Sequence, residues 1–170
     1  SYESDGTLRM DHNYKDGRQV GKQYTFMKGT HELYETIYYN EDGLKEGKFS
    51  SMFTFGAPYV LGSYKNGQKE GAWMKFAETG DTLTIETYQN GKEDGLQVLF
   101  SPTKGTREKE YYMKNDRKDG LYWEYNPANG ELKYEATYQQ GRLNGKERQL
   151  VVSNRFDYWE ITTYVNGRPN

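Results

Sequence analysis

The chain contains no cysteine among its 170 residues. This absence excludes disulfides, thiolate metal ligands and cysteine nucleophiles. Histidine is almost as scarce, since only His12 and His31 occur and neither has a partner at the spacing of metal ligands. No apolar run approaches the roughly 18 residues that a membrane-spanning helix needs. The sequence therefore predicts no metal site, no cofactor and no membrane span.

An excess of one charge is also missing. The 23 basic and 25 acidic residues leave a net charge of -2, and both signs are interspersed along the chain. Proteins that bind nucleic acid or anionic membranes concentrate positive charge on one surface or in one segment. This distribution predicts no nucleic-acid partner.

Aliphatic residues are few, whereas aromatic residues are abundant. Hydrophobic residues make up 34% of the chain, yet aromatic residues reach 16% and include 17 tyrosines; the mean hydropathy is -1.12. Tyrosine can bury its ring while its hydroxyl stays in water. This composition favours a thin structure whose faces are half exposed over a domain with a thick core.

One phrase recurs along the chain. Residues 64–76 read YKNGQKEGAWMKF, and residues 88–100 read YQNGKEDGLQVLF. The first glycine of the phrase, or its substitute, stands at Gly17, Gly43, Gly67, Gly91, Asp116, Gly141 and Gly167, with spacings of 24 to 26 residues. A second glycine follows at Gly21, Gly47, Gly71, Gly95, Gly120 and Gly145. Such self-similarity indicates that residues 1–170 form a single repeat array.

Each phrase has the signals of a β-hairpin. Dipeptides such as Asn66-Gly67 and Asp42-Gly43 suit the type I′ turn that joins two antiparallel strands. After the second glycine, positions +3 and +5 are more apolar than position +4, which predicts a strand with its better-buried face at +3 and +5. No segment has a helical period. We predict an all-β fold: an elongated antiparallel meander of about six to seven tandem β-hairpin repeats in a single-layer sheet, with a period of 24–26 residues.

The second glycine lies inside a predicted strand, where glycine costs about 0.5–1 kcal/mol relative to alanine. A glycine in a strand often marks the close approach of another group. We expect the ring of a neighbouring repeat's tyrosine or tryptophan to lie over this bare backbone.

The phrases Y-x-N-G-x-x-x-G-x-W/F resemble the variant MORN repeat of bacterial proteins that are often labelled antitoxin components. The resemblance covers essentially the whole chain. It implies an elongated meander of hairpins and a binding or scaffolding role without catalysis. The sequence departs from the pattern at Asn115-Asp116 and in RQLVVSNRFDYW near the end.

No cluster of catalytic side chains is apparent, so we expect no enzyme activity and no catalytic residue. The carboxylates of Glu108, Glu110, Glu86 and Glu135 are interpreted as partners of neighbouring lysine and arginine residues on a wet sheet face. The candidate binding surface is a row of aromatic residues at position +2, namely Phe49, Trp73 and Tyr122, together with Trp159. Exposed aromatic stripes bind proteins or sugars. The same rings could instead shield the second face of a single-layer sheet.

These observations favour a non-enzymatic scaffold for protein–protein interaction. The alternative is a glycan or cell-wall binding module that uses the aromatic stripe. Position 1 is Ser and not Met, which is compatible with removal of a leader or a tag. Together with the resemblance, this favours a periplasmic, cell-surface or secreted protein, with a cytoplasmic one as the alternative. Terminal strands of such an array would have open edges, so edge-to-edge self-association is also possible.

Overall fold

The computed structural model describes residues 1–170 and contains strands and turns only. Because it has no helix, it also has none that could cross a membrane. The chain forms two compact units, which are described separately. Unit 1 comprises residues 1–82 and 88–91, and unit 2 comprises residues 83–87 and 92–170.

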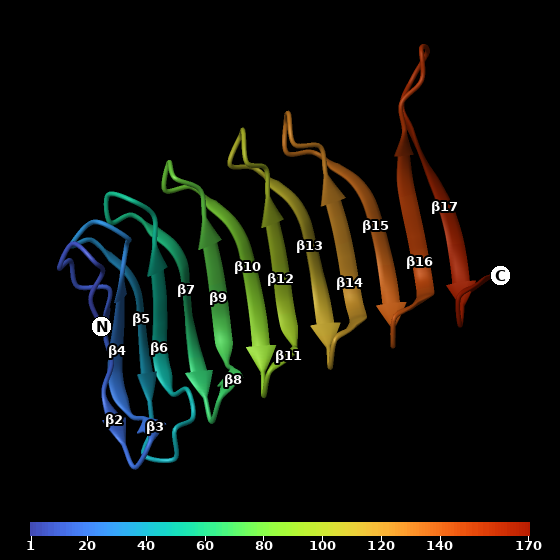
Figure 1. Cartoon of the computed structure of the whole chain (residues 1–170). Helices are drawn as coiled ribbons and strands as arrows, with labels where there is room; N and C mark the ends of the chain where they lie inside the picture. Colours follow the sequence, from blue (N-terminus) through green and yellow to red (C-terminus); the bar gives the residue numbers. More distant parts are fainter. The chain divides into compact units, whose positions relative to one another are not determined.

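Unit 1 is an antiparallel sheet in which strands follow one another in chain order (Figure 1). Its strands are β1 (Met10–Asp11), β2 (Tyr14–Lys15), β3 (Arg18–Gln19), β4 (Gly21–Phe26), β5 (Leu33–Tyr39), β6 (Gly47–Met52), β7 (Pro58–Lys65), β8 (Gln68–Lys69) and β9 (Gly71–Phe76). The sheet order is β1-β4-β5-β6-β7-β9. The short strands β2 and β3 form a separate hairpin, and β8 pairs with the end of β7.

Unit 2 repeats the same arrangement. It begins with the centre of β10 (Thr82–Gln89) and continues through β11 (Lys92–Glu93), β12 (Gly95–Phe100), β13 (Arg107–Lys114), β14 (Arg117–Tyr125), β15 (Leu132–Gln139), β16 (Arg142–Val151), β17 (Tyr158–Val165) and β18 (Arg168–Pro169). From β12 to β18 each strand pairs antiparallel with the next. Neither unit closes into a barrel. The prediction of an all-β fold built from consecutive hairpins is confirmed.

The hairpin turns have the predicted backbone conformation. In the turn at Asn66-Gly67, φ is 50° and 81°, and positive φ at both centres is the mark of a type I′ turn. The turns at residues 16–17, 90–91, 115–116, 140–141 and 166–167 share this conformation. The prediction is wrong at Asp42-Gly43, where only the glycine has positive φ. There the loop is longer, and the amide of Gly43 donates to the carbonyl of Asn40.

Among the second glycines only Gly120 lies against a ring, since its Cβ position would stand 3.6 Å from Cγ of Tyr112, and the expectation of a ring over the glycine is wrong at the other five. Beside Gly21, Gly47 and Gly71 the space that a Cβ would occupy has no neighbour within 4 Å. All six second glycines instead have positive φ, between 71° and 115°. Only glycine adopts such a conformation inside a strand without strain. The recurring glycine is therefore required by a backbone kink.

Successive turns are joined by a repeated pair of hydrogen bonds. The amide of Gly67 donates to the carbonyl of Lys45 in the previous repeat, and the amide of Asn66 donates to the Glu46 carboxylate, each at 2.8 Å. One repeat later, Gly91 donates to Lys69 and Asn90 to Glu70. In unit 2 the first residue of each turn likewise donates its amide to a side chain of the previous repeat. The donor–acceptor pairs are Asn115 with Asp94, Gln140 with Asp119 and Asn166 with Asn144. The residue before the second glycine thus anchors the next turn.

Six of the ten buried residues lie in one row across each sheet, which we call the central row. In unit 2 it runs through Gln97, Tyr111, Tyr122, Ala136 and Glu147, each directly opposite the next on the neighbouring strand. In unit 1 it contains Gln23, Ile37, Phe49, Gly62 and Trp73. The best-buried face is thus the one that bears position +2, and the assignment to +3 and +5 is wrong, since those positions are mostly half-buried.

Candidate functional site

The structure divides the four aromatic residues of the predicted binding surface. Trp73 and Tyr122 belong to the central row and are only 5% and 6% exposed, and Phe49 lies half-buried in the same row. Trp159 is three residues from the central-row position Thr162 on β17, so it lies on the opposite face. Its ring is 4.9 Å from the guanidinium of Arg148. These residues do not form an exposed stripe.

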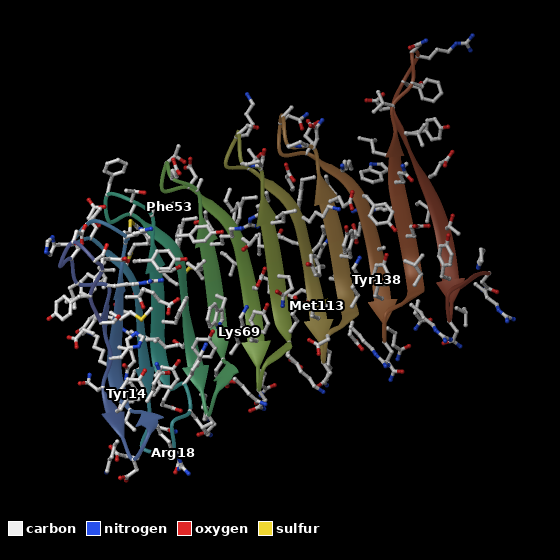
Figure 2. The ribbon with its side chains drawn as sticks, viewed as in Figure 1. Tyr14, Arg18, Phe53, Lys69, Met113 and Tyr138 are labelled. Atoms are coloured by element: carbon white, nitrogen blue, oxygen red, sulfur yellow. The ribbon has the colours of Figure 1, made fainter.

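The rings of unit 1 make a cluster within the central row. Phe49 and Trp73 stack with ring centroids 5.3 Å apart, and Tyr64 meets Trp73 edge-on at 4.9 Å. The tryptophan Nε1 donates to the carbonyl of Ser63 at 3.1 Å. Lys69, which is labelled in Figure 2, places its ammonium 4.5 Å from the Trp73 ring. The cluster therefore serves the interior, as the shielding interpretation expects.

In two repeats the central row has a glutamine where other repeats have an aromatic residue. The glutamine amide forms hydrogen bonds with the backbone of the residue ten positions earlier. Gln97, only 2% exposed, accepts from the amide of Thr87 and donates to its carbonyl at 3.0 Å. Gln23 makes the same pair of bonds with Asn13. In each case the partner lies ten residues earlier, as Ser63 does for Trp73.

An apolar groove of about 550 Å³ opens on unit 1. We call it the unit 1 groove. It is lined by Arg9, Met10, Thr25, Phe26, Met27, Lys28, Tyr34, Met52, Phe53, Thr54 and Tyr59. Phe53 and Tyr59 pack with ring centroids 4.8 Å apart, and Figure 2 labels Phe53 at the end of β6. Methionine side chains adapt to different apolar surfaces, which makes them common at protein-binding sites.

β-Bulges direct two tyrosines into the unit 1 groove. Tyr34 is the extra residue where the pairing of β4 with β5 shifts register, and Tyr59 is the extra residue between β6 and β7. A bulge turns a side chain away from the regular alternation and often stands beside a functional site. The same irregularity between β14 and β15 makes Lys133 the extra residue in unit 2.

Phe55 directly follows the groove residue Thr54 in the chain and has an unusual backbone conformation. It is 92% exposed and has a φ of 77°, in the turn between Phe53 and Gly56. A bulky residue in the left-handed region is strained, and an isolated exposed ring gains nothing from burial. The equivalent residue of the next connection, Thr79, does not have positive φ. Phe55 is thus an exposed apolar side chain that folding alone does not explain.

A polar hollow of about 330 Å³ opens on unit 2. We call it the unit 2 hollow. It is lined by Lys118, Tyr122, Glu124, Lys133, Tyr134, Tyr138, Gln149 and Leu150. Tyr138, on β15, is labelled in Figure 2. Glu124 is bound on three sides, because Tyr122 donates its hydroxyl to it and Lys109 and Lys133 lie 3.1 and 3.6 Å away.

The electrostatics of the unit 2 hollow follow from these contacts. Burial alone would raise the pKa of Glu124, but the hydrogen bonds from Tyr122 and Lys109 together hold this pKa below its usual value. Burial lowers the pKa of Lys118, and the charge of Lys109 adds to this effect. Burial and a hydrogen bond to Glu147 raise the pKa of Tyr134. Tyr122, whose pKa is raised by burial and by its hydrogen bond to Glu124, and Tyr134 are therefore neutral hydrogen-bonding groups at physiological pH.

The residues weighed as catalytic candidates are dispersed. His12 contacts the Gln19 side chain at 3.3 Å. Glu110 accepts from the Tyr125 hydroxyl at 2.7 Å and pairs with Arg107, while Glu135 pairs with Arg148. No three histidine, aspartate or glutamate side chains of residues 1–170 gather closely enough to hold a metal ion.

Of the residues that line the groove and the hollow, only Tyr122 belongs to the binding surface predicted from the sequence. Two phenylalanines in the connection SMFTFGAP were a usable signal, because turns normally favour small polar residues. A lysine two residues after the first glycine, at Lys45, Lys69 and Lys118, was another. Each of these lysines lies over a tyrosine ring in the structure.

No protein-family model matches the sequence, and no curated protein is similar enough to count as a match.

Proposed function

We propose that this protein is a non-enzymatic binding scaffold of the variant MORN-repeat type, whose unit 1 groove receives an apolar segment of a partner protein flanked by acidic residues. The observation that carries the proposal is the groove itself, with its methionine and aromatic lining. Following the resemblance, the proposed location is the bacterial envelope or the space outside the cell.

The methionine and aromatic residues of the groove lining favour an apolar segment of the partner. Met10, Phe26 and Met52 come from three different strands and expose their ends to one opening. Water in such an opening gains little from hydrogen bonding, so an apolar side chain that displaces it is favoured. The exposed ring of Phe55, which follows the groove residue Thr54 in the chain, would become buried only in a complex.

The basic residues of the groove favour acidic residues in the partner. Arg9 and Lys28 line the unit 1 groove, and no acidic residue does. Arg9 pairs with Glu3 at 3.6 Å, whereas no ion pair engages Lys28, so Lys28 supplies the uncompensated charge. Lys75 lies next to it, with its ammonium 5.2 Å from the Tyr59 ring. Rim charges select partners of opposite sign and speed their association. The partner segment should therefore carry Asp or Glu beside its apolar residues.

Selection from a random peptide display library tests this proposal. Peptides that bind the full chain should be enriched in apolar residues next to Asp or Glu. Lys28→Glu reverses an exposed charge and should weaken their binding by about tenfold, and Phe55→Asn should weaken it as well. The controls are Lys104→Glu and Phe156→Asn, which alter exposed residues of connections in unit 2.

The proposal fails if the selected peptides show no acidic and apolar pattern. It also fails if the two groove variants bind the peptides as tightly as the unaltered protein does. Both Lys28 and Phe55 are exposed, so loss of folding does not complicate the result.

A further inference from the structure

A half-buried lysine without a counter-ion faces the unit 2 hollow. The Lys118 ammonium lies 4.2 Å from the ring centroid of Tyr122 and 5.0 Å from that of Tyr138. It makes no ion pair and no hydrogen bond, whereas Lys109 and Lys133 both pair with Glu124. Ring faces attract a cation but cannot accept all of its hydrogen bonds. An ammonium in this position has the capacity to receive an anionic ligand.

The charge of the lining favours a single negative charge on that ligand. Around the hollow, three lysines (Lys109, Lys118 and Lys133) face two glutamates (Glu124 and Glu147), which leaves one positive charge in excess. Glu147 lies beyond them, bound to the Tyr134 hydroxyl at 2.5 Å. A carboxylate matches this balance, whereas a doubly charged anion would be repelled by the two glutamates.

The rest of the lining suits a hydroxylated ring. Tyr134 and Tyr138 offer aromatic surface, Gln149 offers an amide that both donates and accepts, and Leu150 is the one aliphatic residue. A volume of about 330 Å³ falls at the lower end of small-molecule sites. Sugar rings combine apolar C–H faces with hydroxyl groups, so they fit both features.

We propose that the unit 2 hollow binds an acidic sugar residue of a glycan, with the sugar carboxylate against the Lys118 ammonium and its hydroxyls on the Gln149 amide. This inference goes beyond the protein-binding function proposed for unit 1. The two sites lie in different units and share no residue. Either can therefore fail while the other stands.

Calorimetric titration of the full chain tests the inference. The ligands are galacturonate and its oligomers, with galactose as the neutral control and acetate as the carboxylate without a ring. Galacturonate should bind, and both controls should bind at least about tenfold more weakly. Lys118→Met keeps most of the side-chain stem and should abolish the preference for the acidic sugar. Lys45→Met is the matched control, because Lys45 occupies the same repeat position over Tyr64 in unit 1.

Several results would overturn the inference. One is that galacturonate does not bind, and another is that acetate or an acidic peptide binds as well as galacturonate does. A third is that Lys118→Met binds galacturonate normally. Gln149→Ala provides a second test on an exposed residue, where a folding defect is not expected, and it should weaken binding of the sugar without affecting acetate. Lys28→Glu, which tests the unit 1 groove, should leave galacturonate binding unchanged.

Discussion

The indole of Trp73 lies against the bare backbone of Gly62. A Cβ placed at residue 62 would stand 2.3 Å from Cδ2 of the indole, far inside any normal contact. Gly62 is opposite Phe49 on the other neighbouring strand, and the rings of Phe49 and Trp73 stack over it. Glycine at this position is therefore what allows two large rings to share one site in the central row.

Gly62→Ala should destabilise the protein by about 1–3 kcal/mol, because the indole or the backbone must move to accommodate the methyl group. The measurement is the free energy of unfolding in urea. Gly80→Ala provides a comparison, since no atom lies within 4 Å of its Cβ position but its φ is positive. The steric argument is wrong if Trp73→Phe, which shrinks the ring, does not lessen the cost of Gly62→Ala.

Gln97→Leu should cost about 1–3 kcal/mol although it keeps the size of the side chain and makes it more apolar. The substitution leaves the amide and carbonyl of Thr87 without their side-chain partner in a buried place. Gln149→Leu, on an exposed position, should change the free energy of unfolding by much less. Equal effects of the two changes would show that the hydrogen bonds of Gln97 contribute nothing.

The turns could be predicted from the sequence, but the buried face could not. The conformation of Asn66-Gly67 depends on those two residues, so the dipeptide is sufficient. The alternation of residue types along a strand shows that every second residue is buried. Which of the two faces is buried must be inferred from the residue types on each face. Here composition misled, because the central row contains Gln23 and Gln97, whose polar groups are satisfied by backbone that sequence does not reveal.

The two candidate sites were beyond prediction for a related reason. Tyr34, Tyr59 and Lys133 are the extra residues of β-bulges, and the register of each bulge depends on how the connection beside it closes. An aromatic row at position +2 was visible in the sequence. Its role as interior became clear only from the contacts of Trp73 and Tyr122 with neighbouring strands.

Glu70→Ala should weaken the connection between successive turns. It removes the acceptor for the amide of Asn90, a bond of 2.8 Å, and should cost about 1 kcal/mol. Glu46→Ala removes the equivalent acceptor for Asn66 and should have a similar effect. Glu78→Ala, in an exposed connection, is the control. Hydrogen exchange at the Asn90 amide should become faster in Glu70→Ala alone, and unchanged exchange would contradict this assignment.

Alkaline pH should destabilise unit 2 through its tyrosines. Burial, together with the hydrogen bond to Glu110, raises the pKa of Tyr125 from 10.0 to about 12. Because the folded protein holds this proton more tightly than the unfolded chain does, the stabilisation is fully present below pH 10 and is lost as the pH rises toward 12. The pKa of Tyr122 and that of Tyr134 are raised too, so these residues act in the same direction.

Tyr125→Phe isolates one of these contributions. The variant loses the hydrogen bond to Glu110 at every pH, so its free energy of unfolding should lie below that of the unaltered protein near neutrality. Between pH 10 and about 12 the unfolded chain of the unaltered protein releases the Tyr125 proton first, and the variant has no such proton to release. Its stability should therefore decline less steeply in that range, and the two curves should converge. Tyr2→Phe, which removes a hydroxyl at an exposed site, is the control. Parallel curves for Tyr125→Phe and the unaltered protein would mean that the Tyr125 proton is held equally in the folded and unfolded states.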